Sequence, residues 1–241
     1  MLKFLLVASL LMPALTVAEG MEEIVVTAHK RSEALPDTSV FLRRNADFML
    51  LQVEVNNDTR DEEQRADEIH ATLKNFLDAA AKQRNIEVSL ITENDLVVPL
   101  TEQNYRIRVL PGKRVDTSSV YISVKTPIAT DARDGQTLIN KLQSFVGSIK
   151  VVGRTELDAD RDVDISVVGP AQYRNQIISR FAEDVKSVTS ALGPDYRVVV
   201  EGIDGPVYWY RISQLELGLY IPYRYLVLPN SVNAVSITHE Y

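Results

Sequence analysis

Cysteine is absent from this sequence of 241 residues. Its absence excludes disulfide bonds, thiolate nucleophiles and thiolate metal sites in one step. The folded chain therefore has to be stabilised by its apolar core. With 45% hydrophobic residues, the sequence has enough apolar material for one large domain or two small ones.

Clustered positive charge and the short motifs of common enzymes are also missing. The net charge is −7, and the basic pairs Lys30-Arg31, Arg43-Arg44 and Lys113-Arg114 are scattered. Because phosphate contacts need clustered cations, we expect no nucleic-acid partner. No H-E-x-x-H, G-x-S-x-G, P-loop or G-x-G-x-x-G motif occurs, so we predict a non-catalytic protein without a cofactor. The alternative is a hydrolase with a carboxylate pair, which is defined by separation in space and not by sequence spacing.

The first eighteen residues have the order of a secretory signal. A single cation, Lys3, precedes an apolar run from Phe4 to Leu11, and small residues lead to Ala18. The run is shorter than the ~20 residues that cross a bilayer. We predict a signal peptide at 1–18 with cleavage after Ala18, and a mature chain in a bacterial periplasm, with peripheral association at the outer membrane as a further option.

Residues 19–44 are rich in charge and lack sustained periodicity, which predicts a flexible tail. The folded body is predicted over 45–228, and 229–241 form a C-terminal tail. The body begins with a half-buried strand at 48–56, because only alternate positions are uniformly apolar. Thr59 and Glu62 then resemble a capping box that opens a helix with an apolar stripe from Ala66 to Ala80.

Later segments alternate between strands and two further helices. Strands are predicted at 86–90, 105–110, 120–126, 149–157, 162–168, 197–201, 207–212 and 215–228. Leu138 to Gly147 is a shorter helix, and Pro170 to Leu192 is a long one that ends at Gly193-Pro194. Runs of strands between single helices favour the α+β class, with about three helices on a largely antiparallel sheet.

Four aspartates fall at every second position of one stretch: Asp158, Asp160, Asp162 and Asp164. Calcium loops begin in this way, but Val163 stands where the loop needs glycine, and Gly169 stands where it needs a bidentate glutamate. We interpret residues 158–161 as a hairpin turn with a solvated acidic end. We predict no metal site, and calcium binding at 158–164 is the alternative.

The body resembles the SIMPL family of exported proteins. The resemblance rests on the alternation from Phe48 to Asn57, the helix pattern from Arg65 to Gln83 and the strand Ile86-Glu87-Val88-Ser89, and it covers about 45–228. It implies a periplasmic or outer-membrane-associated protein that forms a homo-oligomer and has no established catalytic centre.

The predicted tail is similar to the start of mature TonB-dependent outer-membrane receptors. The similar residues are Glu22, Glu23, Ile24, Val25, Val26, Thr27 and Ala28, followed by Lys30-Arg31 and 32–37. In those receptors this segment is the TonB box, which the periplasmic domain of TonB binds as an added strand. The chain lacks the length of a receptor barrel. The resemblance implies docking to TonB, and the alternative is a β-prone tail that pairs within its own oligomer or with nothing.

Aromatic side chains gather near the C-terminus: Tyr208, Trp209, Tyr210, Tyr220, Tyr223 and Tyr225. Tyr and Trp are favoured where an apolar ring meets a wet edge. We interpret about half of them as core residues, and we predict that the others form an oligomer contact or a surface for glycan or lipid.

Overall fold

The computed structural model describes residues 23–26, 40–92, 97–112, 114 and 116–232. Its largest element is a sheet of eight strands with the order β1-β9-β3-β7-β4-β5, in which β6 also pairs with β7 and β8 with β3. All of its ladders are antiparallel. The strands are β1 (Glu23–Val26), β3 (Phe48–Asn57), β4 (Glu87–Ile91), β5 (Val97–Pro99), β6 (Leu110–Pro111), β7 (Ser118–Pro127), β8 (Thr155–Ala159) and β9 (Asp164–Val168).

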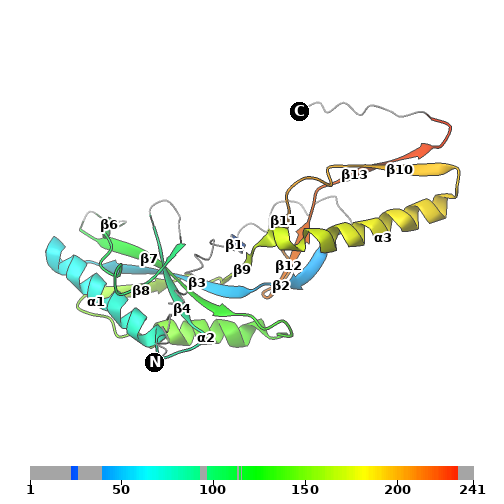
Figure 1. The fold of residues 1–241 in the computed structure, drawn as a ribbon. Coiled ribbons are helices and arrows are strands. Elements are labelled where there is room, and N and C mark those ends of the chain that lie inside the picture. Colours follow the sequence, from blue (N-terminus) through cyan, green and yellow to red (C-terminus); the bar gives the residue numbers. More distant parts are fainter. Residues whose placement is uncertain (1–22, 27–39, 93–96, 113, 115, 233–241) are drawn as a thin grey trace, which may run out of the picture.

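Two helices cover one face of this sheet (Figure 1). They are α1 (Glu62–Ala80) and α2 (Gly135–Gly147), and the rings of Phe76 and Phe145 lie 6.2 Å apart between them. The fully buried side chains of Met49, Leu51 and Ile122 come from the strands beneath. This layer of helix on sheet is the main core, and the apolar stripe of α1 is the reason that the helix packs there.

A second, smaller sheet adjoins the first. It contains β11 (Tyr208–Arg211), β12 (Glu216–Tyr220) and β2 (Leu42–Asn45) in that order. The chain passes from β2 directly into β3, and the Asp47 main-chain amide donates to Ser166 O at 2.8 Å. The two sheets are therefore joined at the corner between β2 and β3.

The remaining elements form an arm that projects from the body (Figure 1). A 3₁₀ turn at Pro170–Tyr173 leads into α3 (Arg174–Leu192), and α3 runs beside the two-stranded ribbon of β10 (Tyr196–Glu201) and β13 (Arg224–Pro229). None of the helices in the described ranges is long and apolar enough to cross a bilayer.

The structure confirms the predicted α+β class, with three α-helices on antiparallel sheet. Two short strands, β1 and β2, fall inside the segment predicted to be a tail, and they pair with β9 and β12. Residues 1–22 and 233–241 lie outside the described residues, so the predicted signal peptide and most of the C-terminal tail stay predictions.

The predicted hairpin turn at 158–161 is wrong. β8 pairs with the far half of β3, β9 pairs with its near half, and both run antiparallel to it. Residues 160–163 interrupt the pairing along this edge of β3, and the Asp160 amide still donates to Gln52 O at 3.0 Å. Residues that favour turns also suit a short irregular stretch within one strand edge. The same sequence pattern therefore fits both this interruption and a hairpin turn.

Two further local predictions are wrong. The N-cap of α1 is Asp61, whose carboxylate accepts from the Gln64 amide at 2.8 Å, while the Thr59 hydroxyl donates to Glu68. The predicted strand at 105–110 is reduced to β6, because the chain bends past α1 and the Ile107 carbonyl lies 2.8 Å from His70 Nε2.

The predicted strand at 215–228 is divided. β12 ends at Tyr220 and β13 begins at Arg224, and the two strands belong to different sheets. Pro222 stands between them without a backbone donor, which is consistent with an end to strand pairing there.

Candidate functional site

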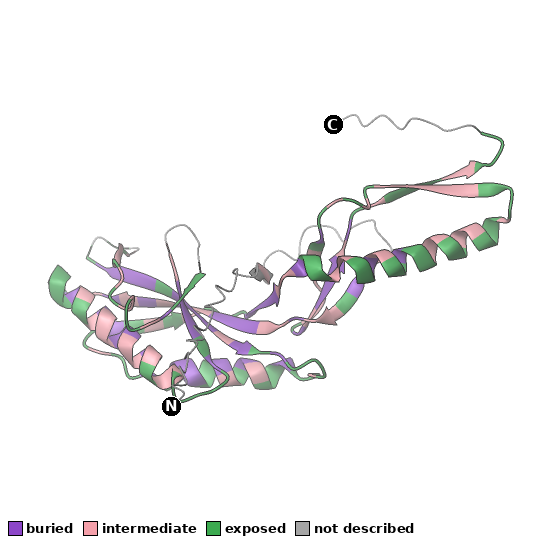
Figure 2. Ribbon diagram, in the orientation of Figure 1, coloured by how far each residue is buried: buried purple, intermediate pink, exposed green. Residues whose placement is uncertain are grey.

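The helix of the arm is joined to the base of its ribbon by a pair of aromatic rings. Phe181 of α3 is 6% exposed, and its ring meets Tyr223 edge to face with 4.3 Å between centroids. Ile177 is the other buried residue of α3. The predicted stripe continues through Val185 and Val188 to Leu192, but Leu192 is 42% exposed. The buried residues of α3 are therefore confined to its first half (Figure 2).

The ribbon of the arm has one face toward α3 and one face away from it. Tyr223 contacts Phe181, and Tyr225 stacks with Tyr223 at 6.3 Å, so the face that carries both rings is the one toward α3. Because side chains alternate along a strand, Leu226 and Leu228 lie on the opposite face. Their partners on β10 share that face, since directly paired residues project to the same side.

The face of the ribbon away from α3, called the outer face below, has an apolar centre and charged ends. Val199 pairs with Leu226, and Leu228 lies beside Arg197, while Glu201 pairs with Arg224. Leu226 is 43% exposed, and it stands at the centre of this apolar stretch. Within the described ranges no other element pairs with either strand of this ribbon. A two-stranded ribbon is only marginally stable in water unless its faces are packed against other elements. Because the apolar centre of the outer face is suited to such packing, this face is the candidate contact surface.

The structure places the six aromatic residues singled out in the sequence in three settings. Tyr223 and Tyr225 lie in the arm. Tyr208 and Tyr220 stack at 5.8 Å on the second sheet, and Tyr210 lies 5.9 Å from Tyr220. Trp209 points to the opposite side of β11 and packs against the core. Trp209 is thus a core residue, and the tyrosines are the ones near solvent.

The solvent-side face of the second sheet is held together by close contacts. Arg43 of β2 forms two hydrogen bonds with the Glu216 carboxylate of β12, from Nε at 2.8 Å and from Nη2 at 2.6 Å. Gly218 sits opposite Tyr210, and a Cβ at Gly218 would lie 2.5 Å from Tyr210 Cζ. Burial raises the pKa of Tyr210 above its ordinary value. The Tyr210 ring therefore lies on the backbone of β12, which needs a glycine there.

The leading segment forms a strand within the described part of the tail. Residues 23–26 are β1, which pairs antiparallel with β9 and lies at the end of the sheet order. The predicted TonB-box-like segment at 22–28 is therefore described only over these four residues. The sequence pattern predicted an extended strand, and it contained no signal for the edge that the strand occupies.

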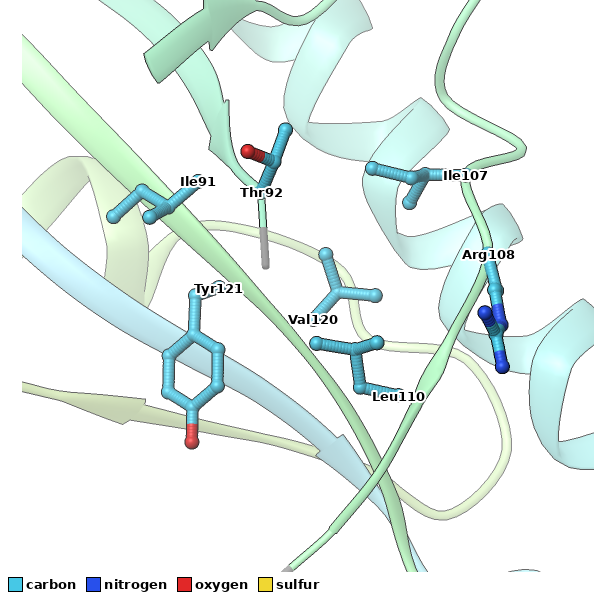
Figure 3. A pocket seen from close by; sticks show the side chains of 7 residues that line it. All are labelled: Ile91, Thr92, Ile107, Arg108, Leu110, Val120 and Tyr121. Carbon is cyan, nitrogen blue, oxygen red and sulfur yellow. The ribbon is translucent and has the colours of Figure 1, made fainter. Parts of the chain in front are cut away.

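An apolar pocket of about 260 Å³ opens at the β4–β7 side of the sheet (Figure 3). Its lining residues are Ile91, Thr92, Ile107, Arg108, Leu110, Val120 and Tyr121. None of these seven is a carboxylate, so the pocket does not contain the acid pair of the predicted alternative function.

A polar pocket of about 220 Å³ does contain two carboxylates. Glu54 of β3 and Asp158 of β8 are direct cross-strand partners, and Asn56, Arg114 and Thr117 also line the pocket. Directly opposed residues have Cβ atoms about 4.5–5.5 Å apart.

The other aspartates of the alternating run do not join Asp158. Asp164 is buried on β9 and accepts from Gln52 Nε2 at 3.1 Å. Among the described residues, no group of three or more His, Asp or Glu side chains is placed to hold a metal ion.

A second carboxylate cluster is structural. Glu68 of α1 accepts hydrogen bonds from the Arg154 amide at 3.0 Å, Asn57 Nδ2 at 2.8 Å, Thr59 Oγ1 at 2.7 Å and Gln64 Nε2 at 2.9 Å. These donors, with the Arg154 amide foremost, lower the pKa of Glu68 to about 2. These four hydrogen bonds tie α1 to the ends of β3 and β8, so the carboxylate has a structural role.

Comparisons with protein-family models, with curated proteins and with solved structures find no match to this chain.

Proposed function

We propose that this chain is an exported, non-catalytic binding and assembly protein of the periplasm or the outer-membrane surface. It self-associates through the outer face of its arm, and it presents residues 22–28 to the periplasmic domain of TonB by strand addition. The observation that carries the first part is the apolar centre of the ribbon, where Leu226 is exposed, Val199 and Leu228 are half-buried, and no further strand in the described ranges pairs with either edge.

A second copy of the chain is the occupant that this face fits best. Arg197 and Glu201 stand at opposite ends of β10 on the same face. A two-fold axis through the apolar centre places Arg197 of one copy against Glu201 of the partner, and the reverse contact forms at the other end. The apolar residues then meet in the middle, as in two packed sheets. Because Glu201 lies opposite Arg224 of its own chain, that end of the face carries both charges, and the match between two copies rests on the apolar centre.

The docking proposal is supported by the extended conformation of residues 23–26 and by their place at the end of the sheet order. The test is a calorimetric titration of the TonB periplasmic domain into the full chain and into a variant that lacks residues 22–28. We expect the deletion to abolish binding, while a matched deletion of residues 30–36 retains it. Circular dichroism checks that both variants stay folded. Equal affinity for the full chain and the 22–28 deletion would discard docking.

A hydrolase acting on glycan or cell-wall material is the second candidate, and the opposed carboxylates of Glu54 and Asp158 are the observation that favours it. Retaining glycosidases need two carboxyl groups about 5–5.5 Å apart, and direct cross-strand partners are close enough for their side chains to reach such a separation. Under this hypothesis, the chain releases dye from labelled peptidoglycan, Glu54→Gln loses that activity, and Glu63→Gln retains it. A wild-type chain that releases no dye excludes the hydrolase.

A further inference from the structure

The edge of β9 that faces away from β3 can be identified from two hydrogen bonds. Ser166 O accepts from the Asp47 amide at 2.8 Å, and the Val168 amide donates to Asp47 Oδ2 at 2.8 Å. The backbone groups of Ser166 and Val168 therefore point toward the β2–β3 corner. Because these groups alternate in direction along a strand, those of Ile165 and Val167 point the other way, toward β1.

The pairing of β1 with β9 then divides the leading segment into two sets of residues. Ile24 pairs with Val167, and Val26 pairs with Ile165. The backbone groups of Ile24 and Val26 therefore face β9, whereas those of Glu23 and Val25 face outward. Two residues of β1 thus supply the backbone hydrogen bonds to the body sheet, and β1 also contacts β11 of the second sheet. This ladder is short compared with the ten-residue ladder of β3 and β7.

β9, the strand with which β1 pairs, is held in place by several contacts. Asp47 accepts from Arg44 Nη2 at 2.5 Å as well as from Val168, and the Arg44 guanidinium lies 4.3 Å above the Tyr173 ring. Ile165 and Val167 are fully buried. β9 is therefore held in place by β3, by the corner at Asp47 and by its own side chains, and its edge persists when β1 is removed.

We propose that this edge of β9, residues 165–168, is a strand-acceptor site that takes residues 23–26, and that the leading segment of a second copy fills it when the first is displaced. An exposed β9 edge would otherwise be open to non-specific pairing. Recognition is by main-chain hydrogen bonds, as in other cases of strand addition. The proposal rests on backbone pairing alone, and it stands whether or not TonB binds the segment.

Two proline variants of the full chain test the site. Ile24→Pro removes a donor that faces β9, whereas Val25→Pro removes one that faces outward and is the matched control. A fluorescent peptide of residues 22–28 is added to each chain, and binding is followed by fluorescence anisotropy. Hydrogen exchange reports on the amides of Ile165 and Val167. Thermal unfolding checks that the body is folded in both variants.

We expect Ile24→Pro to raise the exchange rates of the Ile165 and Val167 amides at least tenfold and to bind the peptide saturably, with recovery of amide protection. The wild-type chain and Val25→Pro should keep these amides protected and bind the peptide at least tenfold more weakly. Peptide binding that is absent from Ile24→Pro, or equal in both variants, would overturn the proposal. So would unchanged exchange in a folded Ile24→Pro chain.

Discussion

Phe181 on α3 and Tyr223 ahead of β13 lie edge to face with 4.3 Å between ring centroids, and this contact joins the helix of the arm to its ribbon at the base. Beyond it α3 has no buried residue. The second half of α3 is therefore only partly covered, by the ribbon that runs beside it.

Replacement of Phe181 by Ala should loosen the arm and leave the eight-stranded sheet intact. Loss of a buried phenylalanine costs about 3 kcal/mol or more in a packed site. We expect faster hydrogen exchange in α3 and β10, with unchanged exchange in β3 and β7. Phe181→Leu keeps most of the apolar volume and should show a much smaller effect. Equal loss of protection in β3 and β7 would show that the arm is not a separate unit.

Charge placed on the outer face of the ribbon should break self-association. Leu226→Asp buries a carboxylate in the proposed contact, while the free arm tolerates it because Leu226 is 43% exposed. Val97→Asp is the matched control, since Val97 is 49% exposed on β5, far from the arm in sequence. Sedimentation velocity should show smaller particles for Leu226→Asp only. The same reduction in both variants would mean that the contact lies elsewhere or is non-specific.

The Glu68 cluster predicts part of the acid sensitivity of the body. The folded pKa of Glu68 is about 2, below its ordinary value of 4.5. The stabilisation is therefore fully present above about pH 4.5 and is lost as the pH falls toward 2. Glu68→Gln should lower the free energy of unfolding near neutral pH and flatten its decline between pH 4.5 and 2. Urea unfolding at several pH values measures both, and parallel declines in the two proteins would refute this role.

Gly218 should tolerate no side chain, because a Cβ there would lie 2.5 Å from Tyr210 Cζ. Gly218→Val displaces the Tyr210 ring and strains the pairing of β11 with β12. We expect a lower melting temperature, and near-ultraviolet circular dichroism should report the altered environment of the tyrosines. The double variant Gly218→Val/Tyr210→Ala removes the clash and should recover part of the stability. Absence of any recovery would place the cost of valine elsewhere.

Much of the fold could be predicted from local pattern. The apolar stripe of α1, the alternation in β3 and the Gly193-Pro194 stop of α3 each report on one element, and the structure contains all three. The hairpin at 158–161 could not be judged in this way, because turn residues do not reveal which strand the chain pairs with afterwards. β8 and β9 both pair with β3, and this pairing is set by the tertiary structure.

The candidate sites were only partly predictable for the same reason. The stripe of α3 is apolar to Leu192, but a stripe does not say whether its partner is the same chain, and here the second half projects from the body. Trp209 and Tyr210 are neighbours in sequence, yet Trp209 packs against the core and the half-buried Tyr210 lies on the opposite face, against Gly218, because side chains alternate along a strand. Likewise, the pairing of Ile24 with Val167 needs the three-dimensional sheet order.

The central claim is that the arm joins copies of this chain, and the mass of the full chain in solution tests it most directly. Light scattering after size-exclusion chromatography, over a hundredfold range of concentration, should give a multiple of the 27.0 kDa of one copy, less any cleaved leader. The Leu226→Asp variant should return to the mass of one copy. A wild-type mass of a single copy at every concentration would contradict the account.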